Sequence, residues 1–235
     1  VKARRRAKLS PQEGGRVIAL PKRKGDRVAA GDVLLELDPS VPQARLDLAR
    51  REQEQVGAER VRACLAAERA ARELGRNRRL AGQGIVATDM LDQVESASRT
   101  TAAACDAAHA TERRAAAAVE VAARQLDYMV LRAPFDGVVA ELAIEVGERS
   151  TPSPPVIQVP AVIDVVDPAS IYVSAPMDEV DSARLHAGLA ARVAVDSHPG
   201  AHFAGHVVRV ANYVLDVEEQ NRTVEIEVAF DDAAL

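Results

Sequence analysis

The sequence contains little aromatic bulk and no long apolar run. Among its 235 residues there is no Trp, and aromatic residues make up 3%. A compact domain of this size normally uses more aromatic side chains in its core, so thin modules and closely packed helices are favoured. No apolar stretch approaches the roughly 18 residues that a membrane-spanning helix needs. The arginine-rich start, residues 1–6, is followed by no apolar segment and does not resemble a signal peptide.

The charge and the missing motifs exclude several classes of function. The net charge of −5 does not fit the basic surface of a nucleic-acid-binding protein. There is no phosphate-binding loop, no nucleophile elbow and no complete set of metal ligands. The sequence therefore predicts a protein that is not an enzyme and holds no cofactor.

One short pattern occurs twice, with a long helical segment between the copies. The copies occupy residues 15–37 and 137–159, at a constant offset of 122 between Gly15 and Gly137 and between Gly25 and Gly147. Each copy shows short apolar alternation punctuated by Gly, Asp or Pro, which is typical of strands joined by tight turns. One copy is too small to bury its own apolar face. We therefore expect the two distant halves to form one β-domain.

This arrangement resembles the biotinyl/lipoyl carrier fold, in a form split by an insertion. The motifs at residues 26–38 (DRVAAGDVLLELD) and 131–139 (LRAPFDGVV) are similar to those of the membrane fusion proteins. These are the HlyD-like periplasmic adaptors of tripartite efflux pumps in Gram-negative bacteria. The resemblance implies an elongated α+β fold: a split biotinyl/lipoyl-like β-domain, interrupted by a long antiparallel coiled-coil α-hairpin and followed by a small β-barrel domain.

The composition along the chain predicts where these parts begin and end. We expect a lead-in strand at 1–10, from the β-barrel or from a membrane-proximal region outside this chain. The first lipoyl-like half then spans 11–38, the hairpin 39–129 with its tip at about 82–88, the second half 130–160 and the β-barrel 161–235. Alternating apolar segments predict barrel strands at 171–175, 191–195, 205–210 and 223–228, with a short helix from Met177 to Leu185.

A three–four apolar spacing predicts the seam between the two helices. In the first helix the seam consists of Leu46, Ala49, Gln53, Val56, Arg60, Ala63, Ala67, Ala70, Leu74, Asn77 and Ala81. In the second it consists of Leu91, Val94, Ser98, Thr101, Cys105, Ala108, Glu112, Ala115, Val119, Ala122, Leu126 and Met129. Folding the chain back near Ile85 places Arg60 opposite Glu112. Thr88 or Asp89 is expected to cap the second helix.

The only two cysteines, Cys64 and Cys105, fall on different helices. An oxidising compartment would permit a disulfide. The register, however, places Cys105 opposite Ala67 and Cys64 beside the seam, beyond the Cα separation of about 7 Å that a bridge tolerates. The sequence favours two small unbridged residues.

Three histidines recur at intervals of four: His198, His202 and His206. Residues four apart on a strand share a face, so they are weak candidates for a metal site. Surface histidines are the simpler interpretation, because no cysteine or carboxylate cluster completes the ligand set.

The hairpin tip resembles the Arg-Leu-Ser motif through which such adaptors engage outer-membrane channels. Arg76 and Leu80 match the motif, Ala87 stands where the motif has Ser, and Thr88 and Asp92 follow. An apolar side chain beside a cation near an exposed tip is typical of a partner contact.

The resemblance implies a periplasmic adaptor, anchored to the inner membrane through a segment outside this chain. Its implied partners are an inner-membrane transporter of RND or ABC type, a TolC-like outer-membrane channel, and further copies of itself in a ring. The alternatives are a lipoyl- or biotin-type carrier, disfavoured because the chain lacks the modified lysine hairpin, and a periplasmic metal-binding protein that uses the histidines.

Overall fold

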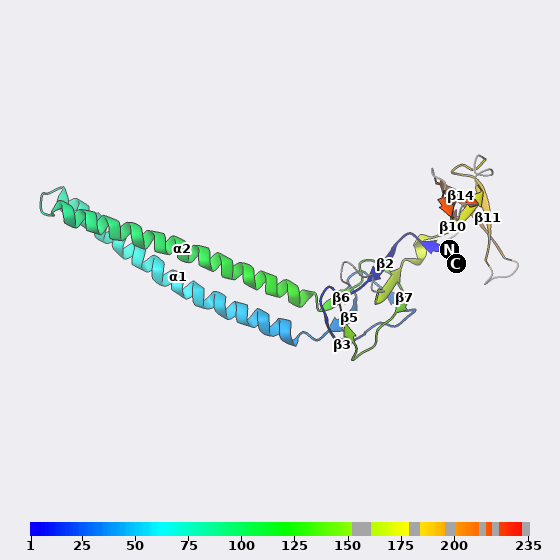
Figure 1. Cartoon of the computed structure of the whole chain (residues 1–235), viewed down its shortest axis with the longest axis horizontal. Coiled ribbons are helices and arrows are strands. Elements are labelled where there is room, and N and C mark those ends of the chain that lie inside the picture. The colour runs from blue at the N-terminus through cyan, green and yellow to red at the C-terminus, as the bar shows by residue number, and fades with distance from the viewer. Residues whose placement is uncertain (152–160, 179–183, 196–200, 212–214, 218–220, 232–235) are drawn as a thin grey trace. The chain divides into compact units, whose positions relative to one another are not determined.

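The computed structural model describes residues 1–151, 161–178, 184–195, 201–211, 215–217 and 221–231. Two compact units can be distinguished: residues 1–36 together with 131–235, and residues 37–130. The first unit holds the β-sheets, and the second is a pair of long helices (Figure 1). None of the helices in the described residues is both long and apolar enough to cross a membrane.

The hairpin consists of α1 (Ser40–Ala81) and α2 (Thr88–Asp127), which lie side by side along their length (Figure 1). Every predicted seam residue of both helices is partly or fully buried. Nε of Arg60 lies 2.9 Å from Oε2 of Glu112, an ion pair in which the Nε–H is not aligned for a hydrogen bond. The predicted register is therefore confirmed.

Glycines end α1, as the sequence predicts. Gly84 adopts a left-handed φ of 74°, and the amide of Ile85 donates to the carbonyl of Leu80 at 3.1 Å. This bond satisfies one of the free carbonyls at the helix end. The predicted cap of α2 was wrong: Ala87 is the N-cap, it makes no side-chain bond, and Thr88 is already the first helical residue.

The cysteine prediction was also wrong. Cys64 and Cys105 form a disulfide, with their Cα atoms 4.7 Å apart. Cys105 does not lie directly across the seam from Cys64. It lies on α2, almost one helical turn nearer the tip than the residue that does. Seam alanines such as Ala67 and Ala108 let the helices approach closely, so a residue beside the seam reaches diagonally across it.

The two copies of the repeat contribute strands to two four-stranded sheets, which are completed by strands outside the copies. One has the order β2 (Arg6–Leu9), β9 (Ile163–Val166), β7 (Gly137–Leu142), β4 (Arg27–Val28). The other has the order β6 (Val130–Arg132), β5 (Val33–Leu37), β3 (Gly15–Ala19), β8 (Arg149–Ser150). Strand β3 of the first half pairs with β8 of the second, and β7 of the second pairs with β4 of the first. Each half thus completes a sheet of the other.

Equivalent residues of the two halves make equivalent bonds. The amide of Gly25 donates to the carbonyl of Val139 at 2.8 Å, and the amide of Gly147 donates to that of Val17 at 2.9 Å. Both glycines are left-handed, with φ of 92° and 97°. Val17 and Val139 are buried. The offset of 122 read in the sequence is therefore a structural equivalence, although the last segment of the second copy, 156–159, lies outside the described residues.

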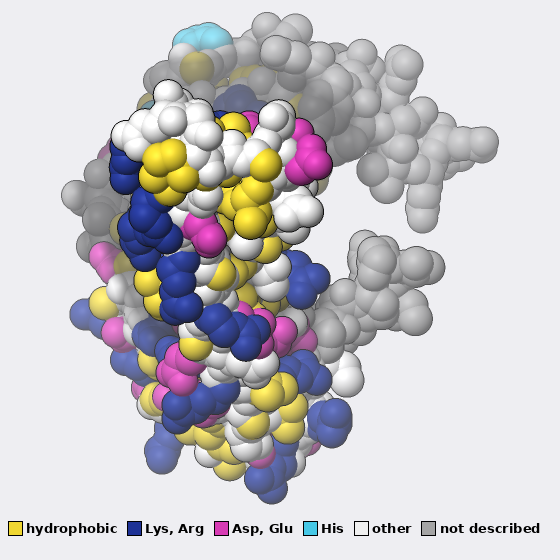
Figure 2. Space-filling model, turned by 90° about the vertical axis from the view of Figure 1, so that its left-hand side faces the viewer, with side chains coloured by type: hydrophobic (Ala, Val, Ile, Leu, Met, Phe, Trp, Pro, Cys, Tyr) yellow, Lys and Arg dark blue, Asp and Glu magenta, His cyan; other side chains and the backbone are white. Residues whose placement is uncertain are grey.

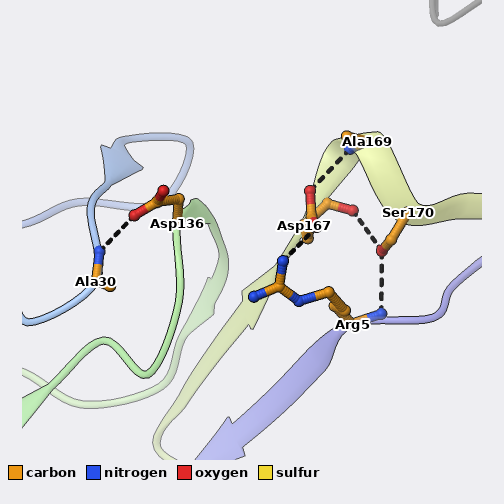
Figure 3. Close-up of polar contacts among 6 residues, drawn as sticks. All are labelled: Arg5, Ala30, Asp136, Asp167, Ala169 and Ser170. Carbon is orange, nitrogen blue, oxygen red and sulfur yellow. Dashed lines mark hydrogen bonds and ion pairs between the residues drawn. The ribbon is translucent and has the colours of Figure 1, made fainter.

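The junctions of this domain are fixed by short polar contacts (Figure 3). Asp136 in the second half accepts a 2.7 Å bond from the amide of Ala30 in the first. Near the lead-in strand, the amide of Arg5 donates to Oγ of Ser170 at 3.0 Å, and its guanidinium lies 3.4 Å from Asp167. Asp167 caps the short 3-10 helix Pro168–Ser170 by accepting from Ala169.

The third sheet has the order β1 (Lys2–Ala3), β10 (Ile171–Asp178), β14 (Asn221–Phe230), β12 (His202–Val210), β11 (Ala190–Ala194), with β13 (Leu215–Val217) beside β14. Its core is formed by Val207, Ile226 and Val228. The four predicted barrel strands are confirmed. The predicted start of a helix at Met177 was wrong, because Met177 and Asp178 end β10 and the Met177 side chain packs on this core.

Candidate functional site: the hairpin tip

The tip exposes three large apolar side chains within a short stretch of chain. Leu80 at the end of α1, Ile85 in the turn and Met90 in the first turn of α2 are 40%, 67% and 52% exposed. The glycine-rich turn brings them near one another by ending α1 and returning the chain at once. Exposed apolar side chains gathered in this way mark contact surfaces. Ile85 and Met90 were not predicted as site residues, although an isoleucine directly after the two glycines of the turn was a usable signal.

A row of arginines leads away from this apolar tip along α1. Arg69, Arg72, Arg76 and Arg79 are exposed and recur at intervals of three or four, which places them on one face of the helix. Figure 2, which views the tip end of the hairpin, shows basic side chains following one another along one side. Of the four, Arg72 lies 3.5 Å from Glu68. The tip therefore presents apolar groups and positive charge together.

An ion-pair network holds the two helices together just behind the tip. The carboxylate of Glu95 on α2 lies 3.2 Å from Arg78 on α1 and 2.9 Å from Arg99 on its own helix. The hydrogen bond from Arg99, followed by the charge of Arg78, lowers the pKa of Glu95. The predicted register already placed residue 78 close to residue 95, so this network could have been found from the sequence.

A shallow depression of about 230 Å³ lies between the helices in the same half of the hairpin. It is lined by Ala70, Glu73, Met90, Gln93, Val94 and Ala97. Most of these side chains are small or apolar, so the depression can accept one apolar side chain of a partner. Its edge includes Met90, whose unbranched side chain adapts to the shape of its neighbour.

The structure places all five predicted tip residues at the surface. Arg76 and Leu80 lie one turn apart on α1, Ala87 and Thr88 stand at the start of α2, and Asp92 follows one turn later. None of the five is a seam residue, so each can contact a partner. Their role in binding stays a prediction.

The predicted histidine cluster has another arrangement. His202 and His206 are both exposed on β12, and Nδ1 of His206 lies 2.6 Å from Oδ1 of Asp231. His198 lies outside the described residues. Within the part of the chain that the structure describes, the one group of three potential metal ligands is Cys64, Cys105 and His109.

Sequence comparison identifies the family to which this architecture belongs. The profile described as RND MFP, barrel-sandwich hybrid domain, matches residues 5–155, more than half of the chain. The chain belongs to this family of membrane fusion proteins.

Among individual proteins, the chain is similar to the macrolide export protein MacA of Yersinia pestis. The two are 27% identical over 201 residues, covering 86% of this chain and 53% of MacA. It is also 27% identical to the multidrug resistance protein MdtN of Escherichia coli O6:H1, covering 87% of this chain and 69% of MdtN. The chain thus spans about half the length of the MacA relative.

Solved structures show the same fold. The crystal structure of MacA from Actinobacillus actinomycetemcomitans matches with a TM-score of 0.87 at 19% identity, covering 97% of this chain and 69% of that one. The membrane fusion protein Spr0693 of Streptococcus pneumoniae R6 matches with a TM-score of 0.64 at 18% identity, covering 98% and 90%. These matches support the predicted combination of a split β-domain, a helical hairpin and a further β-domain.

Proposed function

We propose that this chain is the periplasmic adaptor of a tripartite export system. In this proposal its β-domains contact an inner-membrane transporter of RND or ABC type, its hairpin tip contacts a TolC-like outer-membrane channel, and several copies form a ring. A segment outside these 235 residues anchors the protein to the inner membrane. The domain division predicted from the sequence, with a tip at 82–88, is part of the same proposal.

The observation that carries the proposal is the exposed apolar tip of Leu80, Ile85 and Met90, at the end of a hairpin whose seam is otherwise closed. Exposed apolar side chains also occur elsewhere on the hairpin, such as Leu48 and Val121, but at the tip three of them fall close together around one turn. Membership of the membrane fusion proteins supports the proposal. So do the names of the relatives, which describe export of macrolides and of pyoverdine and resistance to multiple drugs. The role is one of binding and connection, without a catalytic step.

The contact of the tip with the channel can be tested by site-specific photo-crosslinking in cells that express the complete export system. A photoreactive amino acid at position 80 should produce an adduct with the outer-membrane channel. The matched control is position 48: Leu48 lies on the same helix, is 70% exposed and is far from the tip in sequence. Equal adducts at both positions, or none at position 80, would contradict the proposed contact.

A substitution separates binding from folding. Leu80→Asp should abolish the channel adduct formed from a reporter at position 85, because a carboxylate in an apolar contact remains desolvated and unpaired. It should leave the melting temperature of the isolated protein nearly unchanged, since Leu80 is not a seam residue. Leu48→Asp serves as the control. If Leu80→Asp instead unfolds the hairpin, Leu80 has a structural role and the tip assignment fails.

A further inference from the structure

The middle of the hairpin contains a group of reactive side chains that the proposed function does not use. Cys64 lies on α1, and Cys105 and His109 lie on α2. Because Cys105 and His109 are four residues apart, they share a helix face, and that face is turned toward Cys64. Nε2 of His109 lies 3.6 Å from Sγ of Cys64. The two sulfurs and one ring nitrogen lie within 4.8 Å of one another, and all three residues are partly buried.

Cross-linking alone does not account for this arrangement. A disulfide needs two cysteines of suitable Cα separation, and Cys64 and Cys105 satisfy that at 4.7 Å. It needs no imidazole. A ring nitrogen in contact with a sulfur matters when the sulfur is a thiolate, because a nearby imidazole favours that form and because thiolate and imidazole bind the same class of cation.

These two sulfurs and one ring nitrogen determine which kind of cation could bind between them. Two thiolates and one neutral imidazole are the ligands of a tetrahedral Zn²⁺ site that keeps its fourth position open. Two thiolate charges balance a divalent ion, so the occupied site carries no net charge in a half-buried place. Soft sulfur ligands select against Mg²⁺ and Ca²⁺, which prefer oxygen.

The surroundings leave room for the two sulfurs to separate and to bind a metal ion instead of each other. Two sulfurs bound to one tetrahedral Zn²⁺ stand about 3.8 Å apart, as bonds of about 2.3 Å at the tetrahedral angle require. They must therefore separate from their bonded position by rotation of the cysteine side chains. The seam residues beside them, Ala67 and Ala108, are short. One turn nearer the base, the ion pair of Arg60 and Glu112 holds the helices in register whether or not the sulfurs are joined.

We propose that Cys64, Cys105 and His109, once their disulfide is reduced, form a three-ligand site for a thiophilic divalent cation of the Zn²⁺ class. The hairpin then carries either a disulfide or a metal ion, never both. A dithiol reductant supplies the two electrons and the two protons: its sulfurs become a disulfide, and Cys64 and Cys105 become thiols. Cation binding then displaces both thiol protons, while His109 donates the lone pair of one ring nitrogen. This inference is independent of the proposed role in export.

Co²⁺ is a suitable probe, because thiolate ligation gives it charge-transfer absorption in the near ultraviolet that carboxylate or imidazole ligation does not. The protein of 235 residues is reduced with a phosphine under anaerobic conditions and titrated with Co²⁺ alone. We expect charge-transfer bands that saturate at one ion per chain and disappear when Zn²⁺ is added. The oxidised protein is the matched control, since it keeps every other histidine and carboxylate. It should show no such bands.

One variant tests His109 as a ligand, and a second serves as its control. His109→Ala should keep the sulfur bands but weaken Zn²⁺ binding by at least about tenfold, since even an outer partner of a metal ligand has an effect of that size. His202→Ala, at an exposed histidine on β12, should leave Zn²⁺ binding unchanged. Far-ultraviolet circular dichroism verifies that each variant keeps its helices.

Three results would overturn the proposal. One is a reduced wild-type protein that shows no thiolate bands with Co²⁺, a result that depends on no substitution. Another is an oxidised protein that gives the same bands as the reduced one. The third is a folded His109→Ala variant that binds Zn²⁺ as tightly as the wild type, which would remove the imidazole from the site.

Discussion

Arg60 of α1 and Glu112 of α2 face one another across the hairpin, with Nε and Oε2 2.9 Å apart and about a third of each side chain exposed. We expect Arg60→Glu and Glu112→Arg each to destabilise the hairpin, because each places two like charges at a seam. The double exchange should recover part of the loss. The coupling energy in a double-mutant cycle should be about 0.2–1 kcal/mol, measured by chemical unfolding. A coupling of zero would mean that the pair contributes nothing to the register.

The disulfide supplies a second, larger contribution to the same unit. It joins residues 41 apart in sequence. Closing a loop of that length in the unfolded chain should stabilise the hairpin by about 2–4 kcal/mol. Reduction should therefore lower its unfolding temperature, as should the variant Cys64→Ser with Cys105→Ser. If reduction changes nothing, the seam alone limits the stability of the helices.

Much of the hairpin could be predicted from the sequence, because a heptad is a local pattern and alanine, charge and glycine each restrict the register. The disulfide was missed for a geometric reason: the expectation compared residues directly opposite one another, whereas Cys64 and Cys105 meet diagonally. The start of α2 was misplaced by one residue, since Ala87 carries no capping group. The exposed Ile85 and Met90 were not predicted because the tip residues came from the resemblance to the Arg-Leu-Ser motif, which does not include positions 85 and 90.

Less of the β-domain than of the hairpin could be predicted from the sequence. The offset of 122 was visible in the sequence, but which strand pairs with which was not, because pairing between distant halves leaves no local signal. The expected helix from Met177 to Leu185 was wrong at its first two residues, which belong to β10, while residues 179–183 lie outside the described part of the chain. The spacing of polar and apolar residues there fits both a helix and a strand. The contact of Met177 with the core of the third sheet favours the strand at that residue.

A matched pair of glycines tests the packing of the β-domain against that of the hairpin. A Cβ atom on Gly137 would stand 2.5 Å from the carbonyl oxygen of Val166, which belongs to the backbone and cannot turn away. Gly137→Ala should therefore destabilise the β-domain by about 1–3 kcal/mol. On α1, Gly75 has nothing within 4 Å of that position. Gly75→Ala should stabilise the hairpin by up to about 1 kcal/mol.

Hydrogen exchange followed by mass spectrometry can measure both effects, since it reports each segment separately. The strands around 137 and 166 should lose protection in the first variant, and α1 should gain protection in the second. A tolerated alanine at 137 would mean that β7 and β9 lie farther apart than the structure shows.

The equivalence of the two halves can be tested through Gly25 and Gly147. Both have left-handed φ angles and open space around the position of a side chain, so the cost of alanine is one of backbone conformation alone. Gly25→Ala and Gly147→Ala should each destabilise the β-domain by about 1–2 kcal/mol, and by nearly equal amounts. Calorimetric unfolding compares them directly. Clearly unequal losses would show that the repeat is not equivalent in energy.

Acid should weaken the third sheet through Glu225. The hydroxyl of Ser174 and then the ammonium of Lys2, at 2.9 Å, donate to its carboxylate and lower the pKa of Glu225. A group whose pKa is lower in the folded state contributes stability above its unfolded value, about 4.3, and loses it as the pH falls through the folded value. Glu225→Gln should remove this part of the dependence, and Ser174→Ala should remove a share of it. The measurement is unfolding between about pH 2 and 6, and identical profiles for wild type and Glu225→Gln would contradict it.

The base of the hairpin has a consequence for how such proteins diversify. The amide of Leu37 donates to the carbonyl of Met129 at 2.7 Å, so the chain leaves and re-enters the hairpin at a single closed point. The hairpin beyond that point is a separate insertion, so its length can change without a change in any strand. Adding seven residues to each helix keeps the seam in phase and lengthens the arm by about 10 Å. The length of the hairpin can therefore change in steps of one heptad while the β-domain stays the same.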